Sequence, residues 1–172
     1  MSVRPVDRVY MALHRVFMPR WRRRNALDRL IVRAWTRFDT WFYRRFGWSA
    51  SGRMMHVDVL LLRTTGRRTG RVRDAMVACL DGDGSSLIIG GGNWGWDHDP
   101  GWYYNLAANP DVEVVRGRQT VPMRATVLAG AEAETARDAL ATAYPHSQLY
   151  VNRRTRPVPV VRLDPGGDQR QA

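Results

Sequence analysis

An apolar run at residues 60–62 leads into a short stretch that holds five arginines, three threonines and two glycines. The glycines permit a turn whose backbone N–H groups face an anion, and guanidinium groups bind phosphate or carboxylate in pairs. We therefore predict a hairpin that binds a phosphorylated or polyacidic ligand, with an ordinary solvated basic turn as the alternative. A Walker loop is excluded, because no Gly-Lys-Ser/Thr sequence follows and the next residues read as a strand. The stretch comprises Arg63, Thr64, Thr65, Gly66, Arg67, Arg68, Thr69, Gly70, Arg71 and Arg73.

The rest of the chain offers little catalytic chemistry of its own. It has no Gly-x-Ser-x-Gly motif, only four scattered histidines, and no set of serine, cysteine or carboxylate residues suited to hydrolysis. His98 lies between Asp97 and Asp99, but neighbouring residues rarely converge on one ion, so we expect no metal. Asp99 and Pro100 instead fit the N-cap and the first residue of a helix. Such a protein is expected to take its reactive group from a redox cofactor.

Composition indicates an ordinary globular protein. A length of 172 residues, with 44% hydrophobic and 25% charged residues, is typical of one compact domain. All 27 basic residues are arginine, so the number of arginines alone says little about binding. The single cysteine, Cys79, allows no internal disulfide and favours a reducing, cytoplasmic location.

The positive charge is concentrated near the N-terminus. Residues 1–56 hold 13 arginines against three aspartates, whereas residues 57–172 hold 14 arginines against 13 acidic residues. The larger part is nearly neutral and has no nucleic-acid-binding motif, so we do not expect a nucleic-acid partner. The N-terminal segment has neither the apolar run of roughly 18 residues that a membrane span needs nor a signal-peptide pattern. We expect residues 1–24 to contact an anionic membrane surface peripherally, because several arginines act together there.

Helical periodicity runs through this N-terminal segment. Apolar residues between Val6 and Phe17 share one face of a first helix, which ends before Pro19. A second helix, from about Leu27 to Phe42, places aromatic and aliphatic side chains on one side and arginines on the other. We expect the apolar side to pack on the body of the protein, with an anionic bilayer surface as the alternative.

Beyond Gly47 the hydrophobic pattern changes to that of strands. Strands are predicted at residues 57–64, 72–81, 86–91, 111–115, 120–128 and 158–163, and helices at 100–109 and 131–143. Short strands joined as hairpins predict a mainly β fold, a closed or partly closed barrel decorated by helices. We divide the chain into a basic amphipathic helical segment (1–56), a barrel domain (57–164) and a disordered tail (165–172).

Three further motifs accompany the arginine hairpin: Gly92-Asn93-Trp94-Gly95, the run at residues 98–110, and Tyr144-Pro145. Together they resemble the deazaflavin-dependent nitroreductase family, which includes F420H2-dependent quinone reductases, over residues 57–164. The resemblance implies a split β-barrel of the FMN-binding type. It also implies an oxidoreductase that passes hydride from reduced coenzyme F420 to a quinone, a nitro compound or a similar acceptor. An FMN oxidoreductase with the same barrel, and a non-catalytic basic module that binds membranes or nucleic acid, are the alternatives.

The resemblance also implies a cofactor site built from three segments. The hairpin arginines would hold the phosphate and the acidic tail, and the glycine-rich segment would lie near the phosphate or the ring. Many relatives have lysine in place of Arg68, which keeps the charge but changes the geometry. Two alternatives stay open, since Trp102 fits a core position and Asn93 fits a simple turn. The expected cofactor-binding residues are Arg67, Arg68, Thr69, Arg73, Gly91, Gly92, Asn93, Trp94 and Trp102.

Near the C-terminus, the resemblance implies an acceptor pocket lined by tyrosines. This chain has Tyr144, Ser147 and Tyr150 there, so the middle position departs from the pattern and leaves the substrate range open. A tyrosine or serine hydroxyl can donate a proton or a hydrogen bond to the oxygen that is reduced. Tyr-Pro at a helix end also occurs as a packing motif, which is the alternative. We predict these three residues as catalytic.

Overall fold

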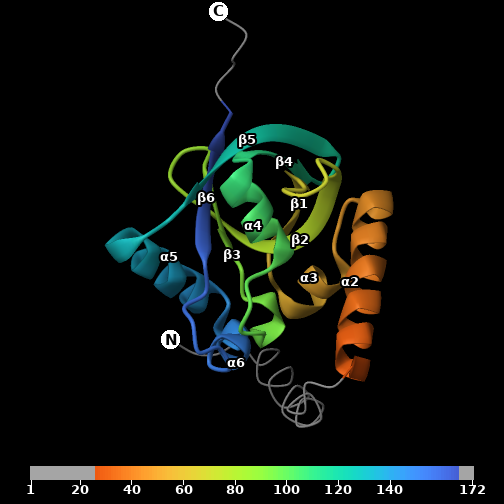
Figure 1. The fold of residues 1–172 in the computed structure, drawn as a ribbon, viewed down its shortest axis with the longest axis horizontal. Helices are drawn as coiled ribbons and strands as arrows, with labels where there is room; N and C mark the ends of the chain where they lie inside the picture. Colours follow the sequence, from red (N-terminus) through yellow and green to blue (C-terminus); the bar gives the residue numbers. More distant parts are fainter. Residues whose placement is uncertain (1–25, 167–172) are drawn as a thin grey trace, which may run out of the picture.

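The computed structural model describes residues 26–166, and the first predicted helix, at residues 6–17, lies outside this range. None of the described helices combines the length and the apolarity needed to cross a membrane. The elements in chain order (Figure 1) are α2 (Ala26–Phe46), α3 (Ala50–Met55), β1 (Val59–Thr65), β2 (Val72–Asp81), β3 (Leu87–Gly90), η2 (Asn93–Gly95), α4 (Gly101–Ala108), β4 (Asp111–Arg116), β5 (Gln119–Val127), α5 (Gly130–Ala143), η3 (Pro145–Ser147), α6 (Gln148–Val151) and β6 (Val160–Pro165).

The six strands close into one antiparallel barrel in the order β1-β2-β3-β6-β5-β4 (Figure 1). Thr65 of β1 pairs with Val72 of β2, so the arginine-rich stretch forms the turn between these strands. β4 and β5 form the second predicted hairpin, with Arg116 opposite Gln119. The predicted barrel is confirmed in its closed form, and the strand ends differ from the prediction by one or two residues.

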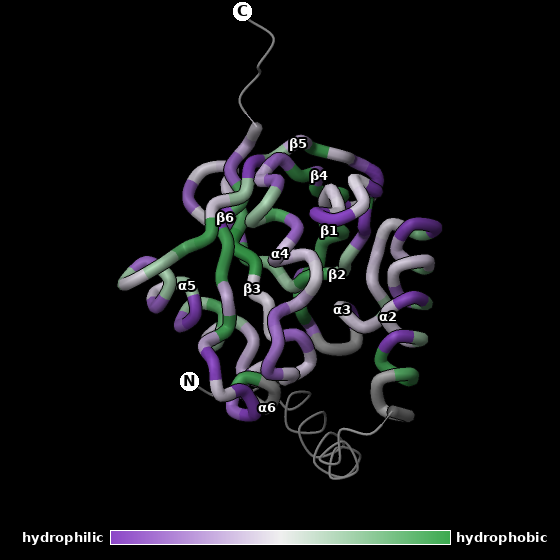
Figure 2. Tube along the Cα trace, in the orientation of Figure 1, coloured by the Kyte–Doolittle hydropathy of each residue, from purple (hydrophilic) through white to green (hydrophobic). Residues whose placement is uncertain are grey.

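Alternate residues of every strand point into the barrel, as the period of two along a strand requires. Each strand supplies two of these side chains, and α4 adds Trp102 and Leu106 from one face of its helix. Hydrophobic segments accordingly coincide with strands such as β3 and β6 (Figure 2). The barrel interior is therefore a packed core, formed by Leu60, Leu62, Val77, Cys79, Leu87, Ile89, Val112, Val114, Met123, Ala125, Val161 and Leu163.

α5 packs against the outer side of the barrel, where Ala133 and Ala136 join Leu128 and Val160 in a second apolar cluster. β6 extends to Pro165, and the Gly166 N–H donates to the carbonyl of residue 122 at 3.0 Å. The prediction of a disordered tail from residue 165 is therefore wrong for residues 165 and 166, because the backbone of both residues pairs with β5. Residues 167–172 lie outside the described range, and the division at residue 56 stays a prediction.

α2 stands beside β2 and is attached through polar groups (Figure 1). Asp39 is buried and accepts hydrogen bonds from the start of α3, including one from the Ser49 hydroxyl at 2.8 Å. A carboxylate is favourable there, because the N–H groups of a helix N-terminus carry partial positive charge. The Tyr43 hydroxyl donates to the Val115 carbonyl and accepts from the Gly117 N–H, both at 3.1 Å. These contacts fix which side of α2 faces the barrel.

The aromatic side of α2 is largely exposed. Trp41 is 58% exposed, Phe38 46% and Trp35 40%, and the rings contact one another. The expectation that this side packs on the body of the protein is wrong for the described residues. The physical reason is that the anchors Asp39 and Tyr43 turn a different side of the helix toward the barrel.

Candidate functional site

The arginine-rich turn between β1 and β2 is held in shape by its glycines and by α4. The Gly66 N–H donates to the Arg71 carbonyl at 2.9 Å, and a Cβ on Gly66 would lie 2.9 Å from the same oxygen, so the close approach requires glycine. From α4, Asn105 Oδ1 accepts a hydrogen bond from the Arg67 N–H at 3.2 Å. The Arg67 guanidinium lies over the Tyr104 ring, 5.0 Å from its centroid. The turn is thus fixed relative to α4.

The structure separates the hairpin residues that were predicted to bind a cofactor. Arg73, on β2, borders a groove of about 1020 Å³ that lies between α2, β2 and the segment 90–102. Arg67, Arg68 and Thr69 are exposed in the turn and border neither this groove nor the smaller cavity beside it. Trp102 is 9% exposed and belongs to the barrel core, yet it also borders the groove. The two alternatives for Trp102 therefore do not exclude each other.

The glycine-rich segment after β3 forms the tight turn η2. Asn93 and Trp94 have left-handed backbone conformations, with φ of 44° and 56°, which cost about 1–3 kcal/mol each and need neighbours to hold them. The Asn93 side chain donates to the His98 carbonyl at 2.8 Å and so braces the turn. A Cβ on the buried Gly91 would lie 2.9 Å from a proline side chain. Asn93 and Trp94 border both the groove and the smaller cavity, Gly91 borders the groove, and Gly92 borders the cavity.

A buried arginine ties this turn to the C-terminal part of the chain. The Arg154 side chain is 0% exposed and donates to Asp99 Oδ1 at 2.6 Å and to the Trp96 carbonyl at 2.8 Å. The neighbouring Thr155 N–H donates to the Asp97 carboxylate at 2.8 Å. Two consecutive residues after α6 therefore hold the segment that follows η2.

The prediction that Asp99 caps α4 is wrong. Pro100 is the N-cap residue, and no side chain caps the helix. The Asp99 side chain is 5% exposed and pairs with Arg154 and, at 3.4 Å, with Arg156. A buried carboxylate needs charged partners, which is why it is not directed to the helix N-terminus. No sequence pattern singles out Arg154, because one arginine does not stand out in a chain whose 27 basic residues are all arginine.

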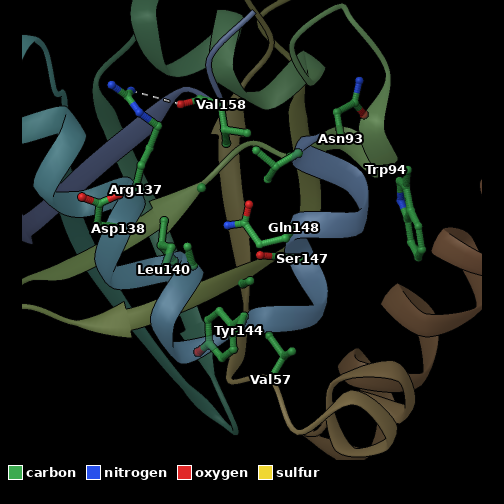
Figure 3. A pocket seen from close by; sticks show the side chains of 15 residues that line it. Val57, Asn93, Trp94, Arg137, Asp138, Leu140, Tyr144, Ser147, Gln148 and Val158 are labelled. Atoms are coloured by element: carbon green, nitrogen blue, oxygen red, sulfur yellow. Dashed lines mark hydrogen bonds between the residues drawn. The ribbon is translucent and has the colours of Figure 1, made fainter. Parts of the chain in front are cut away.

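The smaller cavity, of about 400 Å³, lies between the barrel wall, α5 and α6 (Figure 3). Aliphatic side chains such as Leu140, Val151 and Val158 form much of its lining. It shares part of its lining with the groove, so a ligand in one space lies next to a ligand in the other. The shared residues are Val57, Ala78, Gly90, Asn93 and Trp94.

Tyr144 borders the cavity with its ring, and its hydroxyl points away from Gln148 (Figure 3). The hydroxyl donates to the Cys79 carbonyl at 2.5 Å. Burial raises the pKa of Tyr144 to about 12, so the hydroxyl keeps its proton at neutral pH. The structure thus gives the Tyr144 hydroxyl a partner in the barrel wall, and its catalytic role stays a prediction.

Ser147 and Gln148 bring polar groups to the same cavity. The Gln148 amide projects into the space that α5 and α6 enclose (Figure 3), and none of the hydrogen bonds found within residues 26–166 involves it. Gln148 was not among the predicted residues because it lies outside the tyrosine pattern, although it directly follows the predicted Ser147. The side chain of Tyr150 lies outside the described residues, and its role stays a prediction.

Fold and site together define a class of protein. A closed antiparallel barrel carries an arginine-lined groove on its outer side and a largely aliphatic cavity next to it. Within the described residues, no three His, Cys, Asp or Glu side chains are grouped so that they could hold a metal ion. A groove lined by arginines suits an anionic organic ligand, and the aliphatic cavity beside it suits a smaller apolar one.

The chain belongs to the F420H(2)-dependent quinone reductase family, whose model matches residues 35–165. It is 35% identical over 107 residues to the F420H(2)-dependent quinone reductase Rv1261c of Mycobacterium tuberculosis, covering 60% of this chain and 71% of that relative. The solved structure of an F420-H2 dependent reductase, FDR-A, matches with a TM-score of 0.56 and 29% identity over 62% of this chain and 93% of that one. The protein Atu2129 of Agrobacterium tumefaciens shares the fold, with a TM-score of 0.52 and 15% identity over 64% of this chain and 49% of that one.

The protein is therefore an F420-dependent oxidoreductase with a split-barrel fold, as the resemblance implied. The alternative of an FMN enzyme finds no support in these relatives. The alternative of a non-catalytic basic module is excluded because the chain belongs to a family of reductases.

Proposed function

We propose that coenzyme F420 binds in the groove and that a quinone binds in the smaller cavity. The observation that carries this proposal is the lining that the two spaces share, which includes Gly90, Asn93 and Trp94. Hydride transfer requires the reacting atoms to lie about 3–3.5 Å apart, so the donor and acceptor sites must adjoin. When bound, the reduced deazaflavin supplies the hydride.

The residues of the groove fit a phosphorylated cofactor with an acidic tail. Arg73 borders the groove and takes part in none of the ion pairs found among the described residues, so its guanidinium is available to a phosphate. Asn93 and Trp94 border the small cavity as well as the groove, and we assign them to the ring together with the groove residues Gly91 and Trp102. Arg67, Arg68 and Thr69 are proposed as outer contacts of the phosphate and tail, since their turn directly precedes the strand that carries Arg73. Gly92 is proposed as a backbone contact.

A quinone suits the small cavity better than a charged acceptor. Aliphatic side chains can cover a planar apolar ring, while Ser147 and Gln148 can donate hydrogen bonds to its carbonyl oxygen. These donors stabilise the negative charge that the oxygen gains, and the proton that completes the hydroquinone comes from water. A nitro compound presents similar oxygens and is proposed as a second acceptor. Tyr144 contributes its ring to the wall, and Tyr150 is proposed to close the pocket.

A substitution that fills the cavity tests this assignment. Ala141 borders the cavity from α5, whereas Ala139 on the same helix is exposed and does not. Ala141→Phe should lower kcat/KM for a soluble quinone by at least about 10-fold, because the added phenyl ring would occupy the cavity. F420 affinity, measured by fluorescence titration, should change less than about twofold. Ala139→Phe is the control and should behave as wild type.

Two outcomes would count against the proposal. If Ala141→Phe and Ala139→Phe reduce turnover equally, the cavity is not the acceptor site. If Ala141→Phe instead weakens F420 binding strongly and leaves quinone turnover at saturating coenzyme unchanged, the assignments of the two spaces are reversed.

We also propose that the protein contacts the inner face of the cell membrane peripherally, where lipid-soluble quinones reside. The support is the exposed aromatic side of α2, which is flanked by cations: the Arg45 guanidinium lies 5.4 Å from the Phe46 ring centroid and that of Arg53 lies 4.8 Å from Trp48. Aromatic rings at headgroup level with arginines beside them are typical of interfacial helices. The basic residues 1–24, which lie outside the described range, are proposed to add to the attraction.

Sedimentation with vesicles tests the membrane contact. Replacing Trp41 and Phe38 with serine should weaken partitioning onto anionic vesicles at least about 10-fold, because burying one aromatic side chain contributes about 1.5–3 kcal/mol. Val121→Ser, at an apolar position of β5 that is 43% exposed, is the matched control. Deleting residues 1–24 should remove mainly the part of the binding that salt screens. Equal sedimentation of all variants would refute the contact.

A further inference from the structure

α2 contributes one wall of the groove that we assign to the coenzyme. Its residues Arg33 and Arg37 are one helical turn apart, so their side chains share a side of the helix. Both border the groove together with Thr36, and no residue of α2 borders the smaller cavity. Figure 1 shows α2 alongside β2, the strand that carries Arg73. The groove is therefore lined by arginines from two elements that are distant in sequence.

The acidic groups of the groove are already committed to other partners. Asp74 is 5% exposed at its side chain and binds Arg44, with Arg63 Nε 3.6 Å from its second oxygen. Asp39 accepts its hydrogen bonds from the start of α3. Among the ion pairs of the described residues, none includes Arg33, Arg37 or Arg73. These three guanidinium groups leave the groove with an excess of positive charge.

We infer that Arg33 and Arg37 bind the acidic tail of the coenzyme, so that α2 is part of the cofactor site. This inference rests on the proposed placement of F420 in the groove. The ring must lie at the end that adjoins the acceptor cavity, near Trp94, which directs the phosphate and the tail away from it. The carboxylates of the tail then meet the arginines that α2 supplies. Arginine suits this role because its planar fork binds a carboxylate through two parallel hydrogen bonds.

Coenzyme forms that differ only in the tail provide the test. We would titrate the full-length protein with F420 that carries several glutamates and with the form that has none, and follow binding by fluorescence. Arg33→Gln with Arg37→Gln should weaken binding of the tailed form roughly 3- to 10-fold, because exposed ion pairs contribute modestly. Binding of the tail-less form should change less than about twofold. The loss should shrink as salt is raised from about 0.05 to 0.5 M, since salt screens exposed charges.

Two further variants keep the result specific. Arg118→Gln with Arg124→Gln removes the same charge from exposed positions of the β4–β5 hairpin, which border neither cavity, and should leave both affinities unchanged. Arg33→Lys with Arg37→Lys keeps the charge and should restore most of the affinity for the tailed form. If the glutamine pair binds both forms as wild type does, or weakens both equally, Arg33 and Arg37 do not bind the tail. If wild type binds neither form, the placement of F420 itself is wrong and the inference falls with it.

Discussion

Replacement of the buried Arg154 provides a demanding test of how the site is held together. Removing one partner of a buried ion pair costs about 3–5 kcal/mol, because the other charge stays behind without compensation. Here Asp99 would keep Arg156, whose Nη2 is 3.4 Å from Oδ2 but whose side chain is 62% exposed. We therefore expect Arg154→Met to cost about 3 kcal/mol, at the lower end of that range. For a protein of this size the cost corresponds to a fall in Tm of about 6–12 °C.

Thermal and urea denaturation measure the loss of stability in Arg154→Met, and two variants isolate its cause. Arg156→Met removes an exposed partner of the same carboxylate and should cost less than about 1 kcal/mol. Adding Asp99→Asn to Arg154→Met removes the uncompensated charge, so the double variant should be less destabilised than the sum of the single changes. F420 affinity should fall in Arg154→Met as well, because Arg154 holds the Trp96 carbonyl and Asp99, which follow the turn that Asn93 and Trp94 form. If Arg154→Met lowers the free energy of unfolding no more than Arg156→Met does, and binds F420 normally, the reasoning is refuted.

Three other substitutions test individual residues. Arg73→Ala should weaken F420 binding roughly 10- to 100-fold in a fluorescence titration, since a hydrogen bond to a charged group contributes about 1.5–3 kcal/mol; unchanged affinity would remove Arg73 from the site. Tyr144→Phe should lower the free energy of unfolding by about 1 kcal/mol at pH 7, and a fall in kcat of more than about tenfold would support the predicted catalytic role of its hydroxyl. Burial raises the pKa of Tyr144 to about 12, so the unfolded chain loses this proton at lower pH than the folded protein does. The free energy of unfolding of the wild type should therefore fall between about pH 10 and 12. Urea denaturation at several pH values should show a smaller fall for Tyr144→Phe. Tyr150→Phe should lower kcat but not F420 affinity, and a loss of folding instead would favour a packing role.

The barrel could be predicted because the sequence patterns that specify its strands and turns are local. A period of two in the apolar residues sets which side chains face inward, and the glycines at positions 66, 70 and 117 mark the turns between paired strands. β6 joins the hairpins by pairing with both β3 and β5, and the pairing of β1 with β4 closes the barrel. The prediction failed at residue 165, because Pro and Gly indicated a tail while β5 offered backbone partners there.

The parts that escaped prediction depend on contacts between distant segments. The amphipathic pattern of α2 showed that one side was apolar, but Asp39 and Tyr43 decide which side meets the barrel, and their partners lie in α3 and the β4–β5 turn. Asp99 matched a local capping pattern, yet Arg154, 55 residues later, takes its carboxylate. Local pattern therefore sets the strands, whereas the cofactor groove and the braced turn are products of tertiary structure.

The filled barrel has a consequence for how such enzymes diverge. Inward residues such as Cys79 and Ile89 complete the core, while their neighbours Ala78 and Gly90 on the same strands border the groove and the cavity. With the acceptor placed as proposed, stability and acceptor preference are encoded on opposite faces of one sheet. Substitutions in α5 and α6 can alter the acceptor cavity without disturbing the interior. Related chains can therefore inherit one barrel and one coenzyme while evolving toward different acceptors.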